Sequence, residues 1–438
     1  MAFRKIFTQH IQKKTCHTMA FYKKHGGYEQ AKAALSKRKK PDALIDLVKA
    51  SNLRGRGGAG FPTGVKWGFV PKATDKPKYL VVNADESEPG TFKDRLIMEK
   101  CPHLLLEGIL ICCKAVGIET AYIYIRGEFV FATERLQKAI DEAYDEGFLG
   151  NNALGSGQRI DVTVHRGAGA YICGEETGML TSLEGDRGNP KLKPPFPAIE
   201  GVFGCPTVVN NVETLANLPY ILEIGADAYR AIGPENSPGP KLFCVSGHVE
   251  NPGTFELPMG VPLRTLIDKH AGGVWKGRKL KAVIPGGSSA HVLTADECDV
   301  AMDIESLAAA GTMLGSAGVI VMDETTCMVD AMLNVMRFYH HESCGQCTPC
   351  REGTGWLAKI THRIAHGEGR MEDLDLIQDV CDRMVGKTIC ALADAAAFPA
   401  ESIVKKFKSD FESAIQNGGS PAWKKRHPSV VGGTASHA

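Results

Sequence analysis

The sequence lacks long apolar runs and an excess of charge of either sign. No stretch reaches the roughly 18 uninterrupted apolar residues that a membrane-spanning helix needs. The most apolar segment, 104–116, is interrupted by Glu107 and Lys114. Lys and Arg together number 51, Asp and Glu number 50, and the net charge is +1. We therefore expect neither direct membrane insertion nor a nucleic-acid partner.

The N-terminal residues lack the features of a targeting segment. Basic residues but no acidic ones precede Glu29, and the apolar core of a secretory signal is missing. The same stretch has one Arg and no Ser, unlike the Arg- and Ser-rich transit peptides. We expect residues 1–40 to form a surface arm.

The 14 cysteines do not show the spacing of a disulfide-stapled secreted protein. Most are scattered along the 438 residues, and Cys112, Cys113 and Cys244 fall inside apolar runs. Three lie close together within 344–350. This distribution is typical of a reducing compartment and predicts one metal site.

The first half of the chain alternates predicted strands with predicted helices. Short apolar or β-branched runs at 79–82, 121–125 and 160–164 predict strands, and longer patterned segments at 104–116 and 131–144 predict helices. Such alternation is typical of an α/β fold around a parallel sheet. We expect this α/β domain over residues 41–234.

The composition changes after a Pro- and Gly-rich linker at 234–240. Residues 241–325 predict a small α+β module. Residues 326–415 predict a helical domain with helices at 328–339, 355–366, 374–384 and 400–415. The polar residues 416–438 are expected to be a disordered tail.

The strongest local signal is the triple-cysteine motif at Cys344, Cys347 and Cys350. Two-residue gaps let three thiolates bind one face of a cubane iron–sulfur cluster, and Gly345 and Pro349 suit the turns between them. A fourth ligand must come from downstream. Cys390 follows a predicted helix end, whereas Cys381 falls among apolar residues of a predicted helix and is typical of a core position.

Zinc is the alternative occupant of this site. Structural zinc sites with four thiolates usually combine two separate C-x-x-C pairs, so the overlapping motif favours a 4Fe–4S cluster. His340 and His341 precede the motif and are alternative ligands, although a solvated or packing role is more typical of such residues.

Two glycine-rich stretches indicate places where backbone approaches a ligand. The first, 54–64, has glycines in G-x-G-x-x-G spacing, which lets N–H groups converge on phosphate oxygens. It follows a predicted helix at 42–53 rather than a strand, so it is not a standard dinucleotide-binding motif. The second, 167–174, follows a strand and opens a helix but carries the acidic residues Glu175 and Glu176. Basic residues suited to phosphate accompany the first stretch: Arg54, Arg56 and Lys66.

An acidic turn, 83–90, lies at the carboxyl end of a predicted strand, where α/β sheets place ligands. Its carboxylates can accept hydrogen bonds from ribose hydroxyls or a carboxamide. Aromatic residues beside these segments are candidates for stacking on a nicotinamide or adenine ring: Phe61, Phe69, Tyr171 and Phe196.

Taken together, these motifs closely resemble those of the NADH-binding, flavin-bearing subunit of respiratory complex I, the 51 kDa or F-type subunit. The matching segments, in order, are 54–67, 83–95, 167–177, 193–197, 210–214 and 342–353. The likeness extends from about residue 20 to about residue 415. It implies a Rossmann-like FMN/NADH domain, a β-grasp-like (SLBB) module and a cluster-bearing helical bundle.

The resemblance also assigns residues. Positions that match those contacting FMN and its nucleotide are Gly55, Gly57, Gly58, Gly60, Lys66, Asn83, Asp85, Glu86, Gly174, Glu175, Asn210, Asn211 and Thr214. Positions that match those facing NADH are Phe61, Phe69, Glu88, Glu176, Lys193 and Phe196. The 4Fe–4S ligands would be Cys344, Cys347, Cys350 and Cys390. No side chain acts as a catalytic acid or base, because the flavin accepts the hydride.

The implied function is NADH dehydrogenation within a multisubunit NADH:quinone oxidoreductase. The implied partners are a small 2Fe–2S companion subunit (24 kDa or E-type) and a larger iron–sulfur subunit. The expected location is peripheral, on the cytoplasmic face of a bacterial inner membrane or on the matrix side in mitochondria. One alternative is the diaphorase subunit of an NAD-linked hydrogenase or formate dehydrogenase, and another is a zinc-stabilised nucleotide-binding adaptor.

Overall fold

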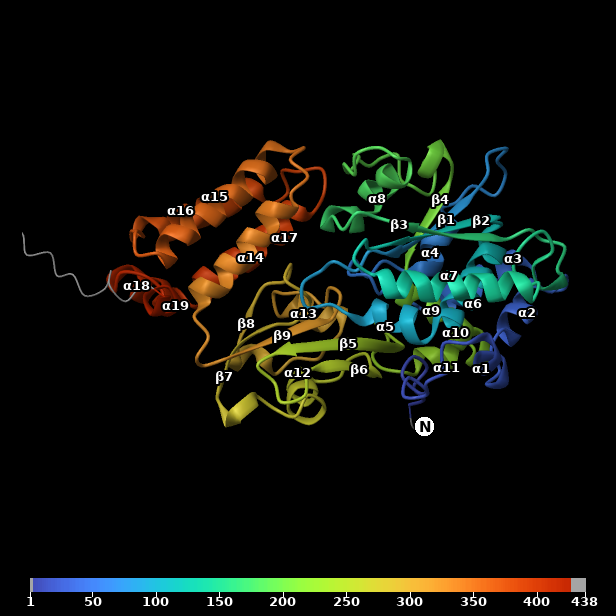
Figure 1. Ribbon diagram of the computed structural model, residues 1–438, viewed down its shortest axis with the longest axis horizontal. Helices are drawn as coiled ribbons and strands as arrows, with labels where there is room; N and C mark the ends of the chain where they lie inside the picture. The colour runs from blue at the N-terminus through green and yellow to red at the C-terminus, as the bar shows by residue number, and fades with distance from the viewer. Residues whose placement is uncertain (1–2, 427–438) are drawn as a thin grey trace, which may run out of the picture.

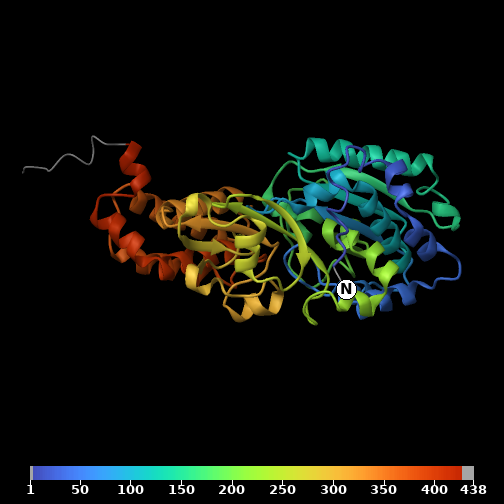
Figure 2. The same ribbon diagram turned by 90° about the horizontal axis from the view of Figure 1, so that it is seen from below.

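Three bodies of secondary structure follow one another along the chain (Figure 1). A computed structural model describes residues 3–426. A helix-covered parallel sheet comes first, a smaller mixed sheet follows, and a bundle of helices ends the described chain. From below, the end of the bundle and the parallel-sheet body lie at opposite ends of the molecule (Figure 2). The mixed sheet lies beneath both of them in the view of Figure 1. This arrangement confirms the predicted fold class.

The first sheet has four parallel strands in the order β3-β2-β1-β4. They are β1 (Tyr79–Ala84), β2 (Thr120–Ile125), β3 (Asp161–Arg166) and β4 (Thr207–Asn211). The central strand β1 is buried at Leu80, Val81 and Val82, as expected of a parallel strand covered on both faces. The polar residue Asn83 lies near the carboxyl end of β1, the edge at which α/β sheets bind ligands.

Helices cover this sheet on both faces. The longest are α6 (Pro102–Val116), buried along almost its whole length, and α7 (Val130–Asp145). The others are α3 (Pro41–Ala50), α4 (Thr63–Gly68), α5 (Lys93–Lys100), α8 (Glu176–Leu183), α9 (Val212–Ala216), α10 (Leu218–Ile224) and α11 (Ala226–Arg230). A short 3₁₀ helix, η2 (Tyr171–Gly174), precedes α8.

The N-terminal residues differ from the expected surface arm. Helices α1 (Met19–Lys24) and α2 (Glu29–Leu35) pack against the first body, and Phe7, Tyr28 and Leu35 are buried in its core. The carboxylate of Glu107, inside the apolar helix α6, accepts hydrogen bonds from Tyr28 N at 2.9 Å and from the Gln30 and Ala31 N–H groups at 3.0 Å. A buried acid therefore anchors this segment.

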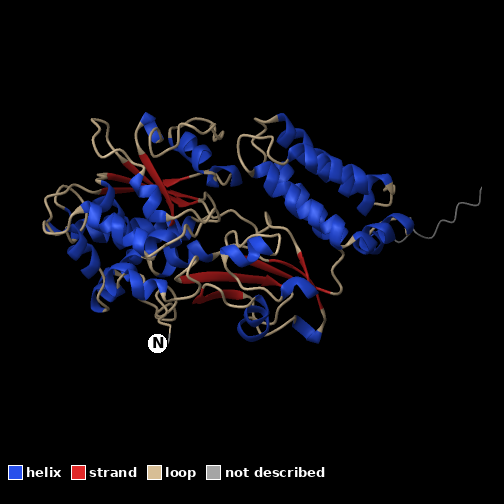
Figure 3. Ribbon diagram, turned by 180° about the vertical axis from the view of Figure 1, so that it is seen from behind, coloured by secondary structure: helices blue, strands red, loops and turns tan. Residues whose placement is uncertain are grey.

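The second sheet is mixed, with strand order β6-β5-β9-β7-β8. Figure 3 shows two separate groups of strands in red, one for each sheet. In the second sheet, only β5 and β9 pair in parallel. Its strands are β5 (Pro240–Gly247), β6 (Gly253–Pro258), β7 (Leu280–Ile284), β8 (Leu293–Thr294) and β9 (Gly318–Asp323). Helix α12 (Leu263–Thr265), which continues as a π-helical turn (Leu266–His270), and α13 (Ile304–Ala309) flank it.

The remaining described residues are helical. They form α14 (Met328–Glu342), α15 (Thr348–Ala365), α16 (Glu372–Met384), α17 (Leu392–Lys406), α18 (Lys408–Gln416) and α19 (Pro421–Arg426). Helix α19 falls inside the segment expected to be a disordered tail, and residues 427–438 of that segment lie outside the described residues. Between residues 3 and 426, no helix has the length and apolar character needed to span a membrane.

Candidate functional site

Residues predicted to hold FMN come together at the carboxyl edge of the parallel sheet. Strands β1 and β4 run side by side, with Val82 opposite Asn210 and Asn83 opposite Asn211. The Asn83 side-chain amide donates to the Gly174 carbonyl at 2.8 Å. The edge of the sheet is thereby joined to the second glycine-rich stretch.

The first glycine-rich stretch folds over the same edge. It follows helix α3, as expected, and closes on itself through a hydrogen bond from Gly55 N to Phe61 O at 2.9 Å. A Cβ on Gly57 would lie 3.1 Å from the Asn211 Cβ, so glycine allows the close approach. Arg56 N donates to the Thr214 hydroxyl at 2.8 Å. Asn211 and Thr214 therefore help to hold the loop in place.

The two arginines of this loop bind protein groups. The Arg56 side chain is buried and donates to Pro238 O at 2.7 Å. Arg54 forms an ion pair with Glu305 at 3.1 Å. Our interpretation of these arginines as phosphate-binding charges is therefore not supported by their contacts. Their partners, the Pro238 carbonyl and the Glu305 carboxylate, are distant in sequence, so the residues around the two arginines could not reveal these contacts.

Two carboxylates of the acidic turn 83–90 have different roles: one stabilises a helix, and the other lies at the candidate site. Glu86 accepts hydrogen bonds from the N–H groups of Lys93, Asp94 and Arg95 and so caps helix α5. Asp85 accepts from the Ser87 hydroxyl at 2.7 Å through one oxygen, while its Oδ2 is buried without a partner. Burial raises the pKa of Asp85 to about 7. An orphaned buried oxygen at the sheet edge suits a ligand hydroxyl, such as those of a ribityl chain.

The acids at the start of α8 also have separate roles. Glu175 is the N-cap, and its Oε2 accepts from the N–H groups of Thr177 at 2.8 Å and Gly178 at 2.9 Å. Glu176 pairs with Lys193 at 2.7 Å and with Lys66 at 3.3 Å. Burial opposes its charge, but the two lysines more than compensate and lower the pKa of Glu176.

Three predicted stacking residues present their rings to solvent. Phe61 is 44% exposed, Phe69 is 55% exposed and Phe196 is 57% exposed. The Phe61 and Phe69 ring centroids lie 6.2 Å apart. Exposed aromatic rings beside polar groups are the kind of surface that a nicotinamide or adenine ring covers. Tyr171 differs, because it is largely buried and its hydroxyl donates to Glu88 at 2.6 Å.

A buried charge cluster that sequence reasoning missed lies beneath the sheet edge. Glu213, on α9, is 0% exposed and pairs with Lys241 at 2.6 Å and with Lys93 at 3.0 Å. Lys93 also pairs with Asp94 at 2.7 Å and donates to the Asn211 side chain at 3.3 Å. Lys241 starts the mixed sheet, so the cluster ties the two sheets together. Its only sequence signal is the position of Glu213 between two predicted site residues.

The cysteines of the predicted cluster come from two loops of the bundle. Cys344 follows α14, Cys347 is the N-cap residue of α15, and Cys350 lies in the first turn of α15. Cys390 lies in the loop between α16 and α17. Burial, then the charge of Glu175 and the neighbouring thiols of Cys350 and Cys344, raise the pKa of Cys390 to about 12. The Ile389 N–H donates to Cys347 Sγ at 3.4 Å, so this loop reaches the triple motif.

The other candidate ligands lie elsewhere. Cys381 is buried in α16, and its thiol contacts Ala397 O at 3.8 Å. His340 lies against Gly355, and the His341 side chain is 85% exposed. Within residues 3–426, no three His, Cys, Asp or Glu side chains are arranged to hold a single metal ion. The thiolates of a cubane cluster stand farther apart than ligands of one ion, because each binds a different iron, and four soft thiols suit such a cluster.

The nucleotide and cluster regions are joined directly. Tyr171 N donates to Glu342 Oε2 at 2.9 Å, which links η2 to the last residue of α14, just before Cys344. The Tyr171 ring also packs edge-on against Phe338, with centroids 5.2 Å apart. Figure 1 shows the cluster-bearing end of the bundle facing the α8 side of the first body.

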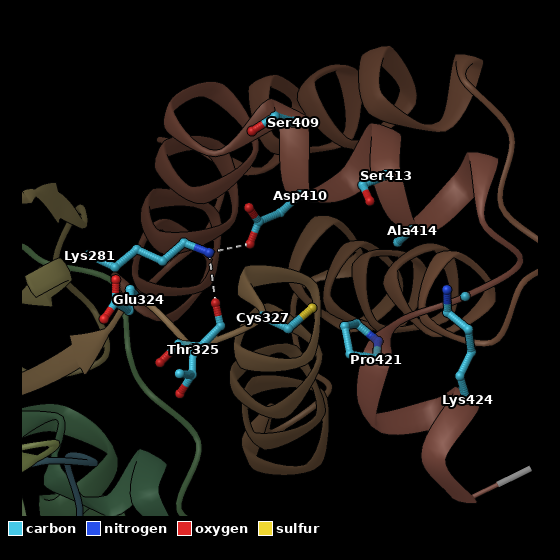
Figure 4. A pocket seen from close by; sticks show the side chains of 12 residues that line it. Lys281, Glu324, Thr325, Cys327, Ser409, Asp410, Ser413, Ala414, Pro421 and Lys424 are labelled. Atoms are coloured by element: carbon cyan, nitrogen blue, oxygen red, sulfur yellow. Dashed lines mark hydrogen bonds and ion pairs between the residues drawn. The ribbon is translucent and has the colours of Figure 1, made fainter. Parts of the chain in front are cut away.

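A cavity of about 260 Å³ lies on the other side of the bundle (Figure 4). Lys281 Nζ pairs there with Asp410 at 2.6 Å and donates to Thr326 O at 2.7 Å. None of the predicted flavin, NADH or cluster residues lines this cavity. Its ion pair fastens the bundle to the mixed sheet.

Three family models match the chain in the order of the three bodies. Residues 48–220 match the Nuo51 FMN-binding domain, residues 241–321 match the SLBB domain, and residues 330–414 match the NADH-ubiquinone oxidoreductase-F iron-sulfur binding region.

Relatives resemble the chain over nearly its whole length. The second F-type subunit of NADH-quinone oxidoreductase in Rhizobium meliloti is 55% identical over 94% of this chain and 98% of its own. The F-type subunit of NADH-quinone oxidoreductase in Streptomyces coelicolor is 53% identical over 92% of this chain and 89% of its own.

Among solved structures, an NAD+-reducing [NiFe]-hydrogenase chain in the H2-reduced state superposes with a TM-score of 0.80 at 36% identity. The match covers 88% of this chain but 65% of that one, whereas both curated relatives are matched over most of their length. The chain belongs to the family of F-type NADH-quinone oxidoreductase subunits.

Proposed function

We propose that FMN lies over the carboxyl edge of the first sheet and that NADH binds against the exposed phenylalanines beside it. As a member of this family, the chain is an NADH dehydrogenase subunit with FMN and a 4Fe–4S cluster as cofactors. FMN supplies the two-electron acceptor for NADH and releases electrons one at a time to the cluster. The proposal assigns the groups of this chain that bind and orient these partners.

Backbone and amide groups at the sheet edge would hold FMN. A Cβ on Gly174 would lie 3.4 Å from the Asp85 carbonyl oxygen and 3.7 Å from Asp85 Oδ2, so Gly174 lies directly beside the free carboxylate oxygen. The free Oδ2 of Asp85 would accept a ligand hydroxyl. The glycines of 55–60 would present N–H groups to the phosphate. The Asn210 Oδ1 accepts a hydrogen bond from Trp67 Nε1 at 2.9 Å. This bond fixes the Asn210 amide, which would also bind FMN.

Aromatic and charged groups would orient NADH, and we place the Glu88 carboxylate among them. Phe61, Phe69 and Phe196 offer the stacking surface. Lys66 and Lys193, both held by Glu176, place positive charge beside it, while Glu176 limits the net attraction for the nucleotide. Hydride transfer needs stacking and orientation and no proton acceptor, so these groups act through position.

The cluster would be held by Cys344, Cys347, Cys350 and Cys390. The observation that carries the proposal is the 2.9 Å hydrogen bond from Tyr171 N to Glu342. It joins the stretch that would hold FMN to the helix end that precedes the first cysteine. Two electron carriers bound at these places would lie in adjacent parts of one chain.

The chain works as one component of a larger complex, as its family name implies. We further propose that the partners that receive electrons or dock beside it are a small 2Fe–2S subunit and a larger iron–sulfur subunit. The location would be peripheral, on the cytoplasmic face of a bacterial membrane or on the matrix side in mitochondria.

The test is the Cys347→Ala variant, purified without oxygen beside wild type. We expect wild type to contain FMN and iron. The variant should lose the cluster absorption and iron but keep FMN and most NADH–ferricyanide activity. Cys298→Ala, which removes a buried thiol from the short 3₁₀ helix after β8, is the matched control. Equal loss of flavin, iron and ferricyanide activity in Cys347→Ala alone would contradict separate flavin and cluster sites.

A further inference from the structure

Glu88 lies where all three bodies of the molecule meet. Its Oε2 accepts the Tyr171 hydroxyl at 2.6 Å. Its Oε1 accepts from Ser289 twice, from the backbone N–H at 2.9 Å and from the hydroxyl at 2.8 Å. Ser289 belongs to the mixed sheet, in the turn that follows β7. Residues of two separate bodies therefore hold the two oxygens of one carboxylate.

The turn at 287–289 is built to close on this carboxylate. Gly287 has a φ of +94°, and a Cβ there would lie 2.6 Å from both Cγ and Oε1 of Glu88. Gly287 N donates to Gly318 O at 2.8 Å, and Ser288 N donates to Pro89 O at 3.2 Å. The turn is thus fixed to its own sheet on one side and to the acidic turn on the other. Only glycine permits the contact.

The third body reaches the same turn. The Ser288 and Tyr339 hydroxyls lie 2.9 Å apart, and Tyr339 is a buried residue of α14. The Tyr171 and Tyr339 rings pack edge-on, with centroids 6.1 Å apart. The helix that leads to the cluster cysteines therefore contacts the turn that holds Glu88.

We propose that the 287–289 turn is a positioning element for the Glu88 carboxylate, so that the mixed-sheet module takes part in setting nucleotide affinity. This inference rests on the placement of NADH beside Glu88 made above. The Ser288 hydroxyl, 3.4 Å from Oε1, is a fourth donor. A carboxylate held by four donors has one orientation, and its charge stays at a fixed distance from a bound nucleotide. Removing the Ser289 hydroxyl takes away the shorter of its two hydrogen bonds to Oε1, so the carboxylate is held less firmly while the fold of both sheets is kept.

The experiment is a double-mutant cycle with Glu88→Gln and Ser289→Ala in the FMN-loaded protein. The measured quantity is the dissociation constant for NAD+, from equilibrium titration at fixed pH. We expect Ser289→Ala to change this constant at least about threefold, in the same direction as Glu88→Gln, and the two effects to be non-additive. Ser289→Thr keeps the hydroxyl and should restore the wild-type constant.

The matched control is Ser246→Ala, in β5 of the same sheet, whose hydroxyl makes only a 3.5 Å contact with Val319 O. It should leave the NAD+ constant unchanged. Additive effects, or equal effects of Ser289→Ala and Ser246→Ala, overturn the positioning role and leave the proposed sites intact. Loss of FMN from Glu88→Gln overturns the placement of NADH beside Glu88, and the inference with it.

Discussion

Glu213→Gln tests whether the buried charge cluster holds the flavin site in shape. The substitution keeps the size of the side chain and an oxygen that can accept from Leu242 N, now 2.8 Å away. It removes the charge that faces the ammonium groups of Lys241 and Lys93. Both cations remain buried, with Asp94 as the remaining partner of Lys93.

The expected loss of stability can be estimated from the pKa of the Glu213 carboxylate. Burial opposes the charge of Glu213, but Lys241, Lys93 and Arg56 more than compensate and lower its pKa from 4.5 to about 2. This difference corresponds to about 3 kcal/mol of stability at neutral pH. Burial also lowers the pKa of Lys241 to about 8, so desolvation of that cation offsets part of the gain. Replacing Glu213 leaves Lys241 without a carboxylate partner and Lys93 with Asp94 alone, and such losses cost roughly 3–5 kcal/mol.

The assay is urea unfolding of the FMN-loaded protein, followed by circular dichroism and by flavin fluorescence. We expect the free energy of unfolding of Glu213→Gln to be about 3 kcal/mol lower than that of wild type. FMN should also be released at a lower urea concentration, because Lys93, which Glu213 holds, positions Asn211. Glu146→Gln, which removes a surface ion pair with Lys23, is the control and should cost less than about 1 kcal/mol. Equal effects of the two variants would refute the reasoning.

The pH dependence has a defined sign. The folded pKa of Glu213 lies below its unfolded value of 4.5. Its contribution is therefore present above pH 4.5 and disappears as the pH falls towards about 2. The stability difference between wild type and Glu213→Gln should shrink on acidification below about 4.5, because the carboxylate charge that distinguishes the two proteins is lost there.

Three further predictions concern other groups. Burial raises the pKa of Asp85 to about 7, so the charged carboxylate destabilises the fold as the pH rises through that value. The melting temperature of Asp85→Asn should therefore exceed that of flavin-free wild type at pH 8 and equal it near pH 3. Glu107→Ala leaves three backbone N–H groups without their acceptor, and should cost about 3 kcal/mol and open residues 3–40 to trypsin, whereas Glu29→Ala on the surface should not. Cys390→Ala should abolish the cluster measured as bound iron, and Cys381→Ala should keep it.

The sequence predicted elements best where one kind of residue dominates. The apolar segment 104–116 became α6, and the β-branched run 121–125 became β2, because burial on all sides demands such residues. The start of α15 was placed seven residues too late, since the helix begins at Thr348, with Pro349 in its first turn. The expected helix over 400–415 is interrupted at Phe407.

Long-range partners of polar residues could not be predicted. Arg56 looked like a phosphate ligand because nothing local shows that Pro238 O lies 2.7 Å from it. The N-terminal residues looked like a surface arm because their anchor, Glu107, is far away in sequence. One signal was available: an acidic residue inside an otherwise apolar helix must find donors if that helix is buried.

Glu88 explains why three modules of different fold work as one unit. The residues proposed to bind flavin lie in the first body and those proposed to bind the cluster in the third, and no covalent segment spans the gap directly. The spacing between the two carriers therefore depends on side-chain contacts, chiefly Tyr171 with Glu342 and Ser288 with Tyr339. Each contact involves a group that also binds Glu88. Tyr171 donates to Glu88 through its hydroxyl, and the 287–289 turn donates through Ser289 N. A change in how Glu88 is held consequently reaches the nucleotide site and the cluster helix together.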